Sequence, residues 1–242
     1  MGKSRLDRIV DMHCHILPGV DDGSRSMVET LKMLKIASSE GITEMIVTPH
    51  YKEGHKNASP EEIETAIQNV TQTAQTLHLN ISLYPGNEIY YFQGVEELLE
   101  EGKVCSMNNS GYVLVEFSPM ETYPVIRNAM DSLASYGYTP ILAHVERYDC
   151  LLNNMHNVER LKRMNVRIQV NASAVVGDDG YKVKQFTSKL LKSQIVDYVS
   201  TDAHRSEERT PSIQRCAAML RRRYDADYVD KILWKNAAGL ID

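Results

Sequence analysis

The sequence predicts an α/β fold in which parallel strands close into a barrel within a single domain. Strand-like and helix-like segments alternate along the chain. Each expected strand is almost continuously apolar, which is typical of parallel strands that are covered on both faces. With 242 residues, 43% of them apolar, the chain can bury one large core, and α/β barrels of this length are commonly single domains.

Seven strands are expected, and each is followed by a helix. The strands are expected at residues 9–12, 42–47, 81–84, 112–117, 140–143, 167–170 and 196–200. The helices are expected at residues 26–39, 60–77, 95–100, 123–136, 157–164, 181–192, 211–224 and 227–234. This order predicts a closed or nearly closed (β/α) barrel over residues 9–242, with residues 1–8 as an N-terminal extension.

Capping signals support the first two helices. Ser26 precedes the first helix and Glu29 follows three residues later, which predicts a capping box, and Gly41 marks the end of that helix. Ser59 precedes the second helix, whose first position is Pro60, the position at which proline suits a helix.

Composition excludes several classes of protein. The formal net charge is -5 and the basic residues are scattered, so no nucleic-acid-binding stripe is expected. We find no leader-like segment and no apolar run of membrane-spanning length, which predicts a cytoplasmic protein without membrane insertion. The four cysteines are far apart and are expected to be reduced thiols.

Cys216 and Arg222 have the Cys-x5-Arg spacing of cysteine-dependent phosphatases. A phosphate-binding loop of that kind needs glycines at a strand-to-helix turn. The intervening residues here are strong helix formers within an amphipathic segment. We therefore interpret the spacing as coincidental.

Residues that commonly bind metals follow the expected strands. His13 and His15 come after the first strand, and because they are two residues apart they can face the same point. One such pair is as often structural as metal-binding. However, the carboxyl ends of parallel barrel strands converge on the face that carries barrel active sites. We therefore expect one site to contain His13, His15, Asp22, His50, Glu88, Glu116, His144, Asp202 and His204.

Five histidines and four carboxylates are more ligands than one ion can use. A mixed set of this kind favours Mn²⁺, Fe²⁺ or Zn²⁺, in two or three ions about 3.5–4 Å apart. Such sites hydrolyse phosphate esters through attack of a metal-bound hydroxide on phosphorus. Arg147 and Arg209 lie close to expected ligands in the sequence, and we expect them to bind the phosphate.

Several longer motifs carry a resemblance to a known family. The sequence resembles the polymerase-and-histidinol-phosphatase (PHP) superfamily, and within it the bacterial manganese-dependent protein-tyrosine phosphatases of capsule and exopolysaccharide operons (CpsB/CapC-like). The resemblance covers nearly the whole chain from residue 8. Its motifs are Asp11-Met-His-Cys-His15, Asp21-Asp-Gly, Thr48-Pro-His50, Gly86-Asn-Glu-Ile-Tyr90, Leu114-Val-Glu-Phe117, Ala143-His-Val-Glu-Arg-Tyr148 and Ser200-Thr-Asp-Ala-His204.

The resemblance implies a distorted seven-stranded barrel of the PHP type that holds three Mn²⁺ ions through the nine residues above. It implies that Glu88 bridges two ions and that Arg147 and Arg209 bind the phosphate. It further implies that the substrate is phosphotyrosine on a membrane-associated bacterial tyrosine kinase that controls polysaccharide assembly. Tyrosines near the expected mouth could flank the substrate ring, although ordinary partial burial is favoured for each: Tyr51, Tyr90, Tyr91 and Tyr148.

Two other functions remain open at this stage. A small-molecule phosphomonoesterase, such as a histidinol-phosphatase, would use the same metals and would differ in having a deep pocket with a carboxylate for the substrate amine. A scaffold protein would use the metals for stability alone and would hold them in coordinatively closed sites. A nuclease-like phosphodiesterase is a weaker alternative, since no basic aromatic groove is evident. The sequence pattern assigns no role to Arg205, which directly follows His204.

Overall fold

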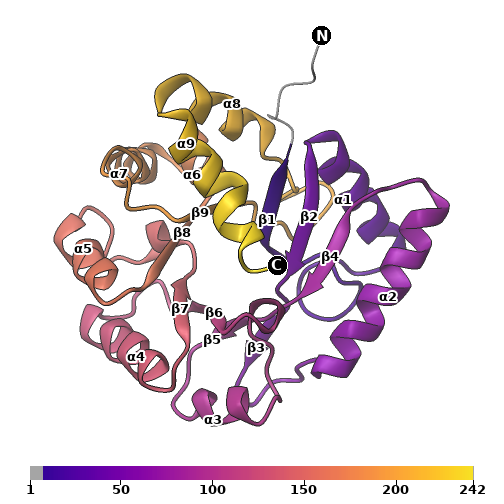
Figure 1. Ribbon diagram of the computed structural model, residues 1–242, viewed down its shortest axis with the longest axis horizontal. Helices are drawn as coiled ribbons and strands as arrows, with labels where there is room; N and C mark the ends of the chain where they lie inside the picture. The colour runs from indigo at the N-terminus through magenta and orange to yellow at the C-terminus, as the bar shows by residue number, and fades with distance from the viewer. Residues whose placement is uncertain (1–7, 242) are drawn as a thin grey trace.

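The computed structural model describes residues 8–241, and in it parallel strands form a ring that is surrounded by helices (Figure 1). The strands of this part of the chain are β1 (Ile9–Cys14), β2 (Ile42–Val47), β3 (His50–Lys52), β4 (Ser82–Pro85), β5 (Glu88–Tyr90), β6 (Tyr112–Glu116), β7 (Thr139–Leu142), β8 (Arg167–Asn171) and β9 (Tyr198–Ser200).

The α-helices are α1 (Met27–Ser39), α2 (Pro60–Thr76), α3 (Val95–Glu100), α4 (Tyr123–Ser135), α5 (Met155–Arg163), α6 (Ala172–Val176), α7 (Tyr181–Lys192), α8 (Gln214–Arg223), α9 (Ala226–Asp230) and α10 (Asn236–Ala238). Two short 3₁₀ turns and a π-helical turn complete the elements: η1 (Met107–Asn109), η2 (Val145–Arg147) and η3 (Lys231–Lys235).

The described residues contain nine strands where the sequence pattern predicts seven. They form two parallel sheets, with the orders β1-β2-β4 and β3-β5-β6-β7-β8-β9. The difference arises because β3 follows β2 after only Thr48 and Pro49, and β5 follows β4 after only Gly86 and Asn87. Pro49 has no N–H group to donate to a neighbouring strand, so the ladder is interrupted there. A bridge between Cys14 and Ala203 links β1 to the segment after β9 and so connects the two sheets.

The capping signals predicted for α1 and α2 are found, with one correction at α1. At α2 the capping box is complete, since Ser59 and Glu62 bond each other's backbone N–H groups. At α1 the Ser26 hydroxyl accepts from the N–H of Glu29, but the Glu29 carboxylate accepts from the N–H of Arg25 instead of that of Ser26. The predicted capping box at α1 is therefore only half formed, because the same carboxylate also faces an arginine from the loop after β9.

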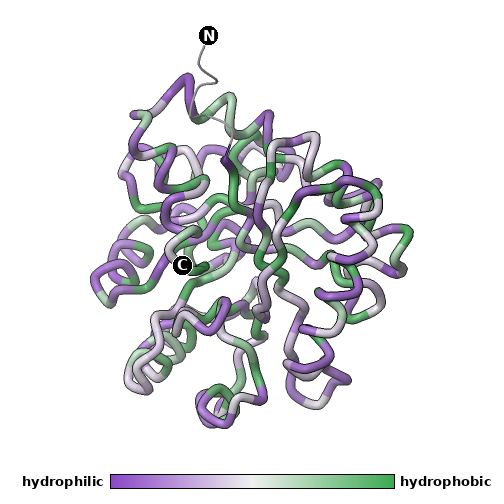
Figure 2. The backbone as a smooth tube through the Cα atoms, turned by 45° about the vertical axis from the view of Figure 1, so that its right-hand side comes forward, coloured by the Kyte–Doolittle hydropathy of each residue, from purple (hydrophilic) through white to green (hydrophobic). Residues whose placement is uncertain are grey.

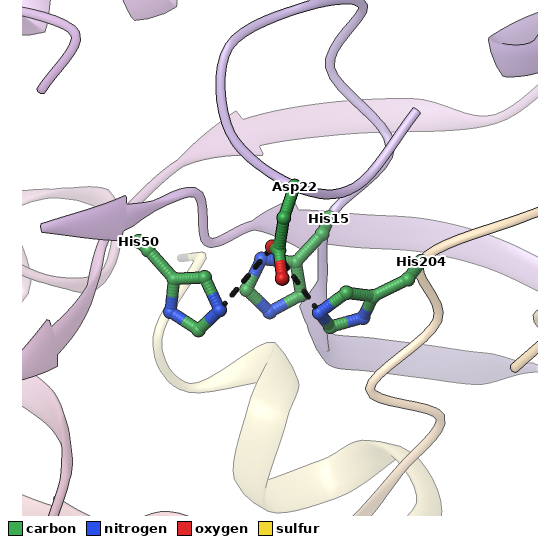
Figure 3. A group of neighbouring side chains, drawn as sticks. All are labelled: His15, Asp22, His50 and His204. Atoms are coloured by element: carbon green, nitrogen blue, oxygen red, sulfur yellow. Dashed lines mark ion pairs between the residues drawn. The ribbon is translucent and has the colours of Figure 1, made fainter. Parts of the chain in front are cut away.

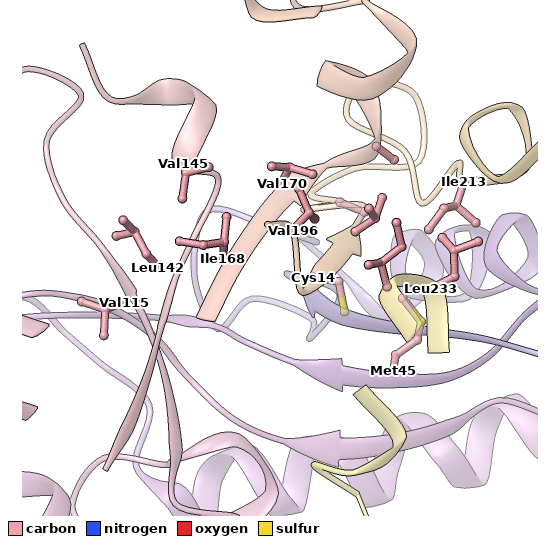
Figure 4. Close-up of a cluster of buried hydrophobic side chains, with 14 of the residues drawn as sticks. Cys14, Met45, Val115, Leu142, Val145, Ile168, Val170, Val196, Ile213 and Leu233 are labelled. Carbon is pink, nitrogen blue, oxygen red and sulfur yellow. The ribbon is translucent and has the colours of Figure 1, made fainter. Parts of the chain in front are cut away.

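Two apolar layers hold the ring together. The larger layer lies between the strands and the outer helices and includes Met45, Leu142 and Ile168 (Figure 4). The outer helices alternate between hydrophilic and hydrophobic residues along their length, as expected for helices with one buried face (Figure 2). The smaller layer fills the inside of the ring and includes Val10 and Met12.

A register break in β1 turns both histidines of the first motif toward the centre. Val10 and Met12 belong to the inner layer, whereas Cys14 belongs to the outer layer. In a regular strand these three side chains would point to one side. The pairing of β1 with β2 shifts between Asp11 and Cys14, and this shift allows the change of side.

The C-terminal segment covers one end of the ring. Helices α9, η3 and α10 follow one another without a break, and Ala237 and Leu240 join the inner layer. The last described residues lie near the axis of the ring (Figure 1). Of the expected N-terminal extension, residues 1–7 lie outside the described residues, and Arg8 pairs with Glu44 at 2.7 Å. Among residues 8–241, no helix is both long and apolar enough to cross a membrane.

Candidate metal centre

The carboxylate of Glu88 lies at the middle of the predicted site. It begins β5 and is 1% exposed. Its Oε2 atom lies 3.1 Å from Nε2 of His13, from Nε2 of His15 and from Nδ1 of His50, and its Oε1 atom lies 2.9 Å from Nε2 of His144. Four imidazoles from three segments of the chain therefore surround one buried carboxylate.

Three overlapping groups of side chains have ligand atoms close enough to hold an ion. The groups are His15, Asp22, His50 and His204; His13, His15, Glu88 and Asp202; and His50, Glu88 and Glu116. Figure 3 shows the first group, in which the Asp22 carboxylate lies between His50 and His204, with Asp22 Oδ1 to Nε2 distances of 3.5 and 3.6 Å. Each pair of groups shares one residue, so the three positions lie next to one another.

The structure thus brings all nine predicted residues together. Eight of them belong to the three groups, and the ninth, His144, belongs to none of the groups found among the described residues. Its Nε2 atom nevertheless faces the carboxylates of both Glu88 and Glu116, at 2.9 and 3.5 Å.

The donor atoms fit divalent cations. Within residues 8–241, four buried side-chain atoms at this centre have no hydrogen-bond partner: Nδ1 of His50, Oε2 of Glu88, Nδ1 of His144 and Oδ1 of Asp202. A buried polar atom without a partner is costly, and a carboxylate oxygen most of all. Imidazole and carboxylate donors together suit Mn²⁺, Fe²⁺ and Zn²⁺.

Both predicted phosphate-binding arginines meet Asp202. Nη2 of Arg147 and Nη2 of Arg209 each lie 2.7 Å from the Oδ2 atom of this carboxylate. Their side chains are 39% and 44% exposed, so the outer N–H groups face solvent. The two guanidinium groups also line a cavity of about 420 Å³ beside the centre, which Ser173 and Thr210 help to form.

Three residues of the site have an unusual backbone conformation. The φ angles of His144, Asp202 and Arg209 are 31°, 53° and 48°, in the left-handed region that residues other than glycine rarely adopt. Backbone strain of this kind collects at functional sites, where the surrounding structure enforces it.

Asp21 holds the first loop against the centre, a role that the sequence pattern did not assign. Its Oδ2 atom lies 2.7 Å from Nδ1 of His15 and accepts from the N–H of His50, while Oδ1 accepts from the N–H of Gly23. Burial works against ionisation, but His15 and these bonds hold the pKa of Asp21 well below its usual value. A Cβ atom on Gly23 would lie 2.1 Å from the carbonyl oxygen of His15, so only glycine fits here.

Arg205 connects the same loop to the segment after β9. Its Nη2 donates to the carbonyl oxygen of Asp22 at 2.6 Å, and its Nη1 lies 3.5 Å from the carboxylate of Glu29. On the other side of β1, Asp11 accepts from the N–H of Thr201 at 3.0 Å. These contacts hold the segment after β9 against β1 and the loop that follows β1.

Burial and neighbouring charges shift the pKa values of two histidines of the centre in opposite directions. For His144 burial lowers the pKa, but the carboxylates of Glu116 and Glu88 outweigh it and raise the pKa to about 9. For His204 burial and the neighbouring His15 lower the pKa to about 2. In the absence of cations, protonated histidines therefore balance the buried carboxylates.

We expect the metal-free protein to lose stability as the pH rises from 6.5 to about 9. His144 has an ordinary pKa of 6.5 when unfolded and about 9 when folded. Between these values the folded state binds more protons, so the free energy of unfolding falls with rising pH, by on the order of 1–3 kcal/mol. His204 does not oppose this, since its depressed pKa affects stability only below pH 6.5.

With excess Mn²⁺ the slope should reverse, because metal binding displaces these protons and is favoured at higher pH. Urea unfolding at pH 6.5 and pH 9, with and without Mn²⁺, measures both slopes. Equal falling slopes in the two conditions would contradict the assignment of these histidines to a metal centre.

The structure settles two further predictions about single residues. Tyr148 is fully buried and its hydroxyl accepts from the N–H of Phe117, so it does not flank a substrate ring, whereas Tyr51, half-buried, stacks on Phe92.

Cys216 lies within α8 and is buried, and burial raises the pKa of its thiol. The interpretation of the Cys-x5-Arg spacing as coincidental is confirmed, because no loop can form around a phosphate there.

Comparisons with known proteins agree with this architecture. CpsB of Streptococcus pneumoniae, named a tyrosine-protein phosphatase, is 29% identical over 238 residues, which cover 96% of this chain and 98% of CpsB. Among solved structures, crystal structures of YwqE from Bacillus subtilis and CpsB from S. pneumoniae are described as unique metal-dependent tyrosine phosphatases. The matched structure has a TM-score of 0.90 at 26% identity, and the match covers 96% of this chain and 94% of the chain in that structure.

More distant matches concern the fold alone. The phosphotriesterase homology protein of Escherichia coli has a TM-score of 0.60 at 13% identity and covers 98% of this chain and 99% of its own. The family model described as "Capsular polysaccharide synthesis, CpsB/CapC" matches residues 9–242, which is nearly the full length of the sequence. The chain therefore belongs to the CpsB/CapC family of capsular polysaccharide synthesis proteins.

Proposed function

We propose that this chain is a metal-dependent protein-tyrosine phosphatase, with residues 9–242 as a catalytic domain of the PHP barrel type. The observation that carries the proposal is that Arg147 and Arg209 both contact the Oδ2 atom of Asp202. This contact lies directly beside the three overlapping groups of metal-ligand side chains. The named relatives are tyrosine-protein phosphatases. This arrangement suits a phosphoryl group that is held by cations on one side and by guanidinium groups on the other.

We assign the nine clustered residues as ligands of three ions, most suitably Mn²⁺. Glu88 would be the ligand shared between two ions, because its two oxygens face different sets of imidazoles and because it belongs to two of the groups. His15 and His50 are also shared, but each imidazole nitrogen serves one ion only. The bound cations would supply Lewis-acid catalysis, since they neutralise charge on phosphoryl oxygens and lower the pKa of an attacking water.

The residues of the chain itself perform binding and orientation. Arg147 and Arg209 would bind the outer phosphoryl oxygens through the N–H groups that do not contact Asp202. Asp21 holds Nδ1 of His15 in the protonated form, so that Nε2 faces the centre. Asp22 is the most exposed of the nine, at 68% of its side chain, and therefore lies at the mouth.

The proposed substrate is phosphotyrosine on a protein, and a membrane-associated bacterial tyrosine kinase of capsule synthesis is the partner we expect. A tyrosine leaving group has a pKa of about 10 and needs less protonation than an alkyl alcohol. A small amine-bearing substrate would need a carboxylate in the cavity. Asp178 and Asp179 line this cavity, but both are exposed and Asp178 is already paired with Arg215. A cytoplasmic location remains a prediction, in keeping with four free cysteines.

The proposal is tested by comparing two substrates on the same protein. Protein stripped with a chelator should release no phosphate, and reconstitution with Mn²⁺ should restore release from a phosphotyrosine peptide far more than from histidinol phosphate. The reverse preference would keep the metal centre and replace the substrate. If protein fully loaded with Mn²⁺ released no phosphate from either substrate, the metals would have a structural role and the phosphatase assignment would be refuted.

A further inference from the structure

We propose that Gln169 and Asn171 of β8 position three of the metal ligands, and that they do so as one hydrogen-bonded relay. The inference rests on the metal centre of the proposed function. Strand β8 carries none of the nine ligand-type residues, yet its two amide side chains are 0% and 1% exposed and lie against the centre. Buried amides in a strand need a reason, because each must find partners for both its oxygen and its NH₂ group.

The relay runs between ligands of three different strands or loops. The Oε1 atom of Gln169 accepts from the backbone N–H of His144 at 2.6 Å and lies 3.4 Å from Nδ1 of His13. The Nε2 atom of Gln169 donates to Oδ1 of Asn171 at 2.9 Å. The Nδ2 atom of Asn171 then donates to Oδ2 of Asp202 at 2.9 Å.

The direction of the relay follows from one fixed donor. The backbone N–H of His144 can only donate, so the oxygen of Gln169 must face it, and the NH₂ group must then face Asn171. The NH₂ group of Asn171 in turn must face the carboxylate of Asp202. Since the oxygen of Gln169 also faces His13, Nδ1 of His13 carries the proton and its Nε2 lone pair faces the centre.

At Asp202 the relay separates two roles of one carboxylate. Its Oδ2 atom receives donors from Asn171, Arg147 and Arg209. Its Oδ1 atom has no hydrogen-bond partner among the described residues and lies 3.5 Å from Nε2 of His13. Saturation of Oδ2 therefore directs Oδ1 to a cation and keeps the phosphate-binding arginines at a set distance from it.

The same contacts explain how His144 keeps its strained backbone. Its φ of 31° is held by the bond from its N–H to Gln169, and the side chain thereby points at Glu88. Asn171 is also the N-cap residue of α6, but its side chain makes no capping bond there. Its side-chain amide therefore bonds Gln169 and Asp202 and makes no capping bond, while its backbone N–H donates to Glu146.

Two substitutions at Gln169 separate positioning from packing. Gln169→Met keeps the length of the side chain and removes all its hydrogen bonds, whereas Gln169→Glu keeps the oxygen that faces His144 and His13. If the relay positions ligands, Gln169→Met should weaken Mn²⁺ binding by about 10–100-fold, the usual cost of losing an outer partner of a ligand. Gln169→Glu keeps the acceptor for His144 and His13 but loses the NH₂ donor to Asn171, so it should weaken Mn²⁺ binding less than Gln169→Met does. A role in packing alone predicts the opposite order, since methionine suits a buried site and a carboxylate does not.

Val170→Ala provides the matched control, because Val170 is buried on the opposite face of the same strand. It should destabilise the fold and leave Mn²⁺ affinity unchanged. Affinity is measured by calorimetric titration of the stripped full-length chain with Mn²⁺ alone, so the result does not depend on phosphatase activity. Asn171→Ala should weaken Mn²⁺ binding in the same way as Gln169→Met. The double variant should cost less than the sum of the two, because both substitutions break one relay.

A spectroscopic signature completes the test. In protein loaded with diamagnetic Zn²⁺, the ring nitrogens of His13 should show the Nδ1–H tautomer, and this signature should be lost in Gln169→Met. Unchanged Mn²⁺ affinity in Gln169→Met, or the order expected from packing, would overturn the relay. If the unaltered protein binds Mn²⁺ but hydrolyses no phosphotyrosine, the proposed function fails while the relay still stands or falls on affinity.

Discussion

Replacing Glu88 by glutamine is expected to reduce phosphate release from a phosphotyrosine peptide by at least about 100-fold, the upper end of what the loss of a ligand's outer partner costs. Glutamine has the same shape but no charge, and its NH₂ group would face imidazole nitrogens that lie 3.1 Å from Oε2 in the present structure. The variant would also lose the one carboxylate shared by two ligand groups. Bound metal, measured by elemental analysis after dialysis, should fall together with activity.

Glu96→Gln is the matched control for this experiment. Glu96 is likewise a buried glutamate, at 2% exposure, but it lies on α3 and bonds the hydroxyl of Tyr91. Its substitution should affect stability and leave metal content intact. A Glu88→Gln protein with full metal content and normal turnover would exclude Glu88 from the centre.

The positions of most elements could be predicted from the sequence, because long apolar runs and caps act locally. Helix α7 begins and ends at the expected residues, and α4 differs from its expected range by one residue. Strands β3 and β5 could not be found in this way. Each has three residues, and each exists because His50 pairs with Glu88 and its neighbours follow. Such a pairing is a property of the folded ring and leaves no periodicity in the chain.

The candidate site likewise combines residues that local patterns predict with residues whose roles depend on the folded structure. Its nine ligand-type residues were predictable, since their chemistry is distinctive and parallel strands end on one face. Residues that hold them in place were not. Arg205 bonds the carbonyl of Asp22 across 183 residues, and Gln169 bonds His144 across 25. A visible but weak signal existed for β8, where two amides alternate with apolar residues at the carboxyl end of a buried strand.

The second large effect is expected for Arg147→Ala, which should lower kcat by about 10²–10³-fold, as the loss of one donor to a developing anionic oxygen does. Among the described residues, the side chain of Arg147 pairs with the centre at Oδ2 of Asp202, which keeps Asn171 and Arg209 as partners when Arg147 is removed. Metal content should therefore stay unchanged. Loss of turnover with full metal content would exclude a scaffold whose metals serve stability alone.

Arg215→Ala is the matched control, because Arg215 lines the same cavity but is paired with Asp178 at 2.9 Å, and turnover should be nearly normal. Arg147 and Arg209 share one anchoring oxygen, so their effects should not be additive. When either arginine is removed, the other can move closer to Asp202 and bind the phosphate less well. The double variant should therefore lower kcat by less than the product of the two single effects. If Arg147→Ala lost metal as well as turnover, its main role would be to orient Asp202, and the phosphate would have to be bound chiefly by Arg209.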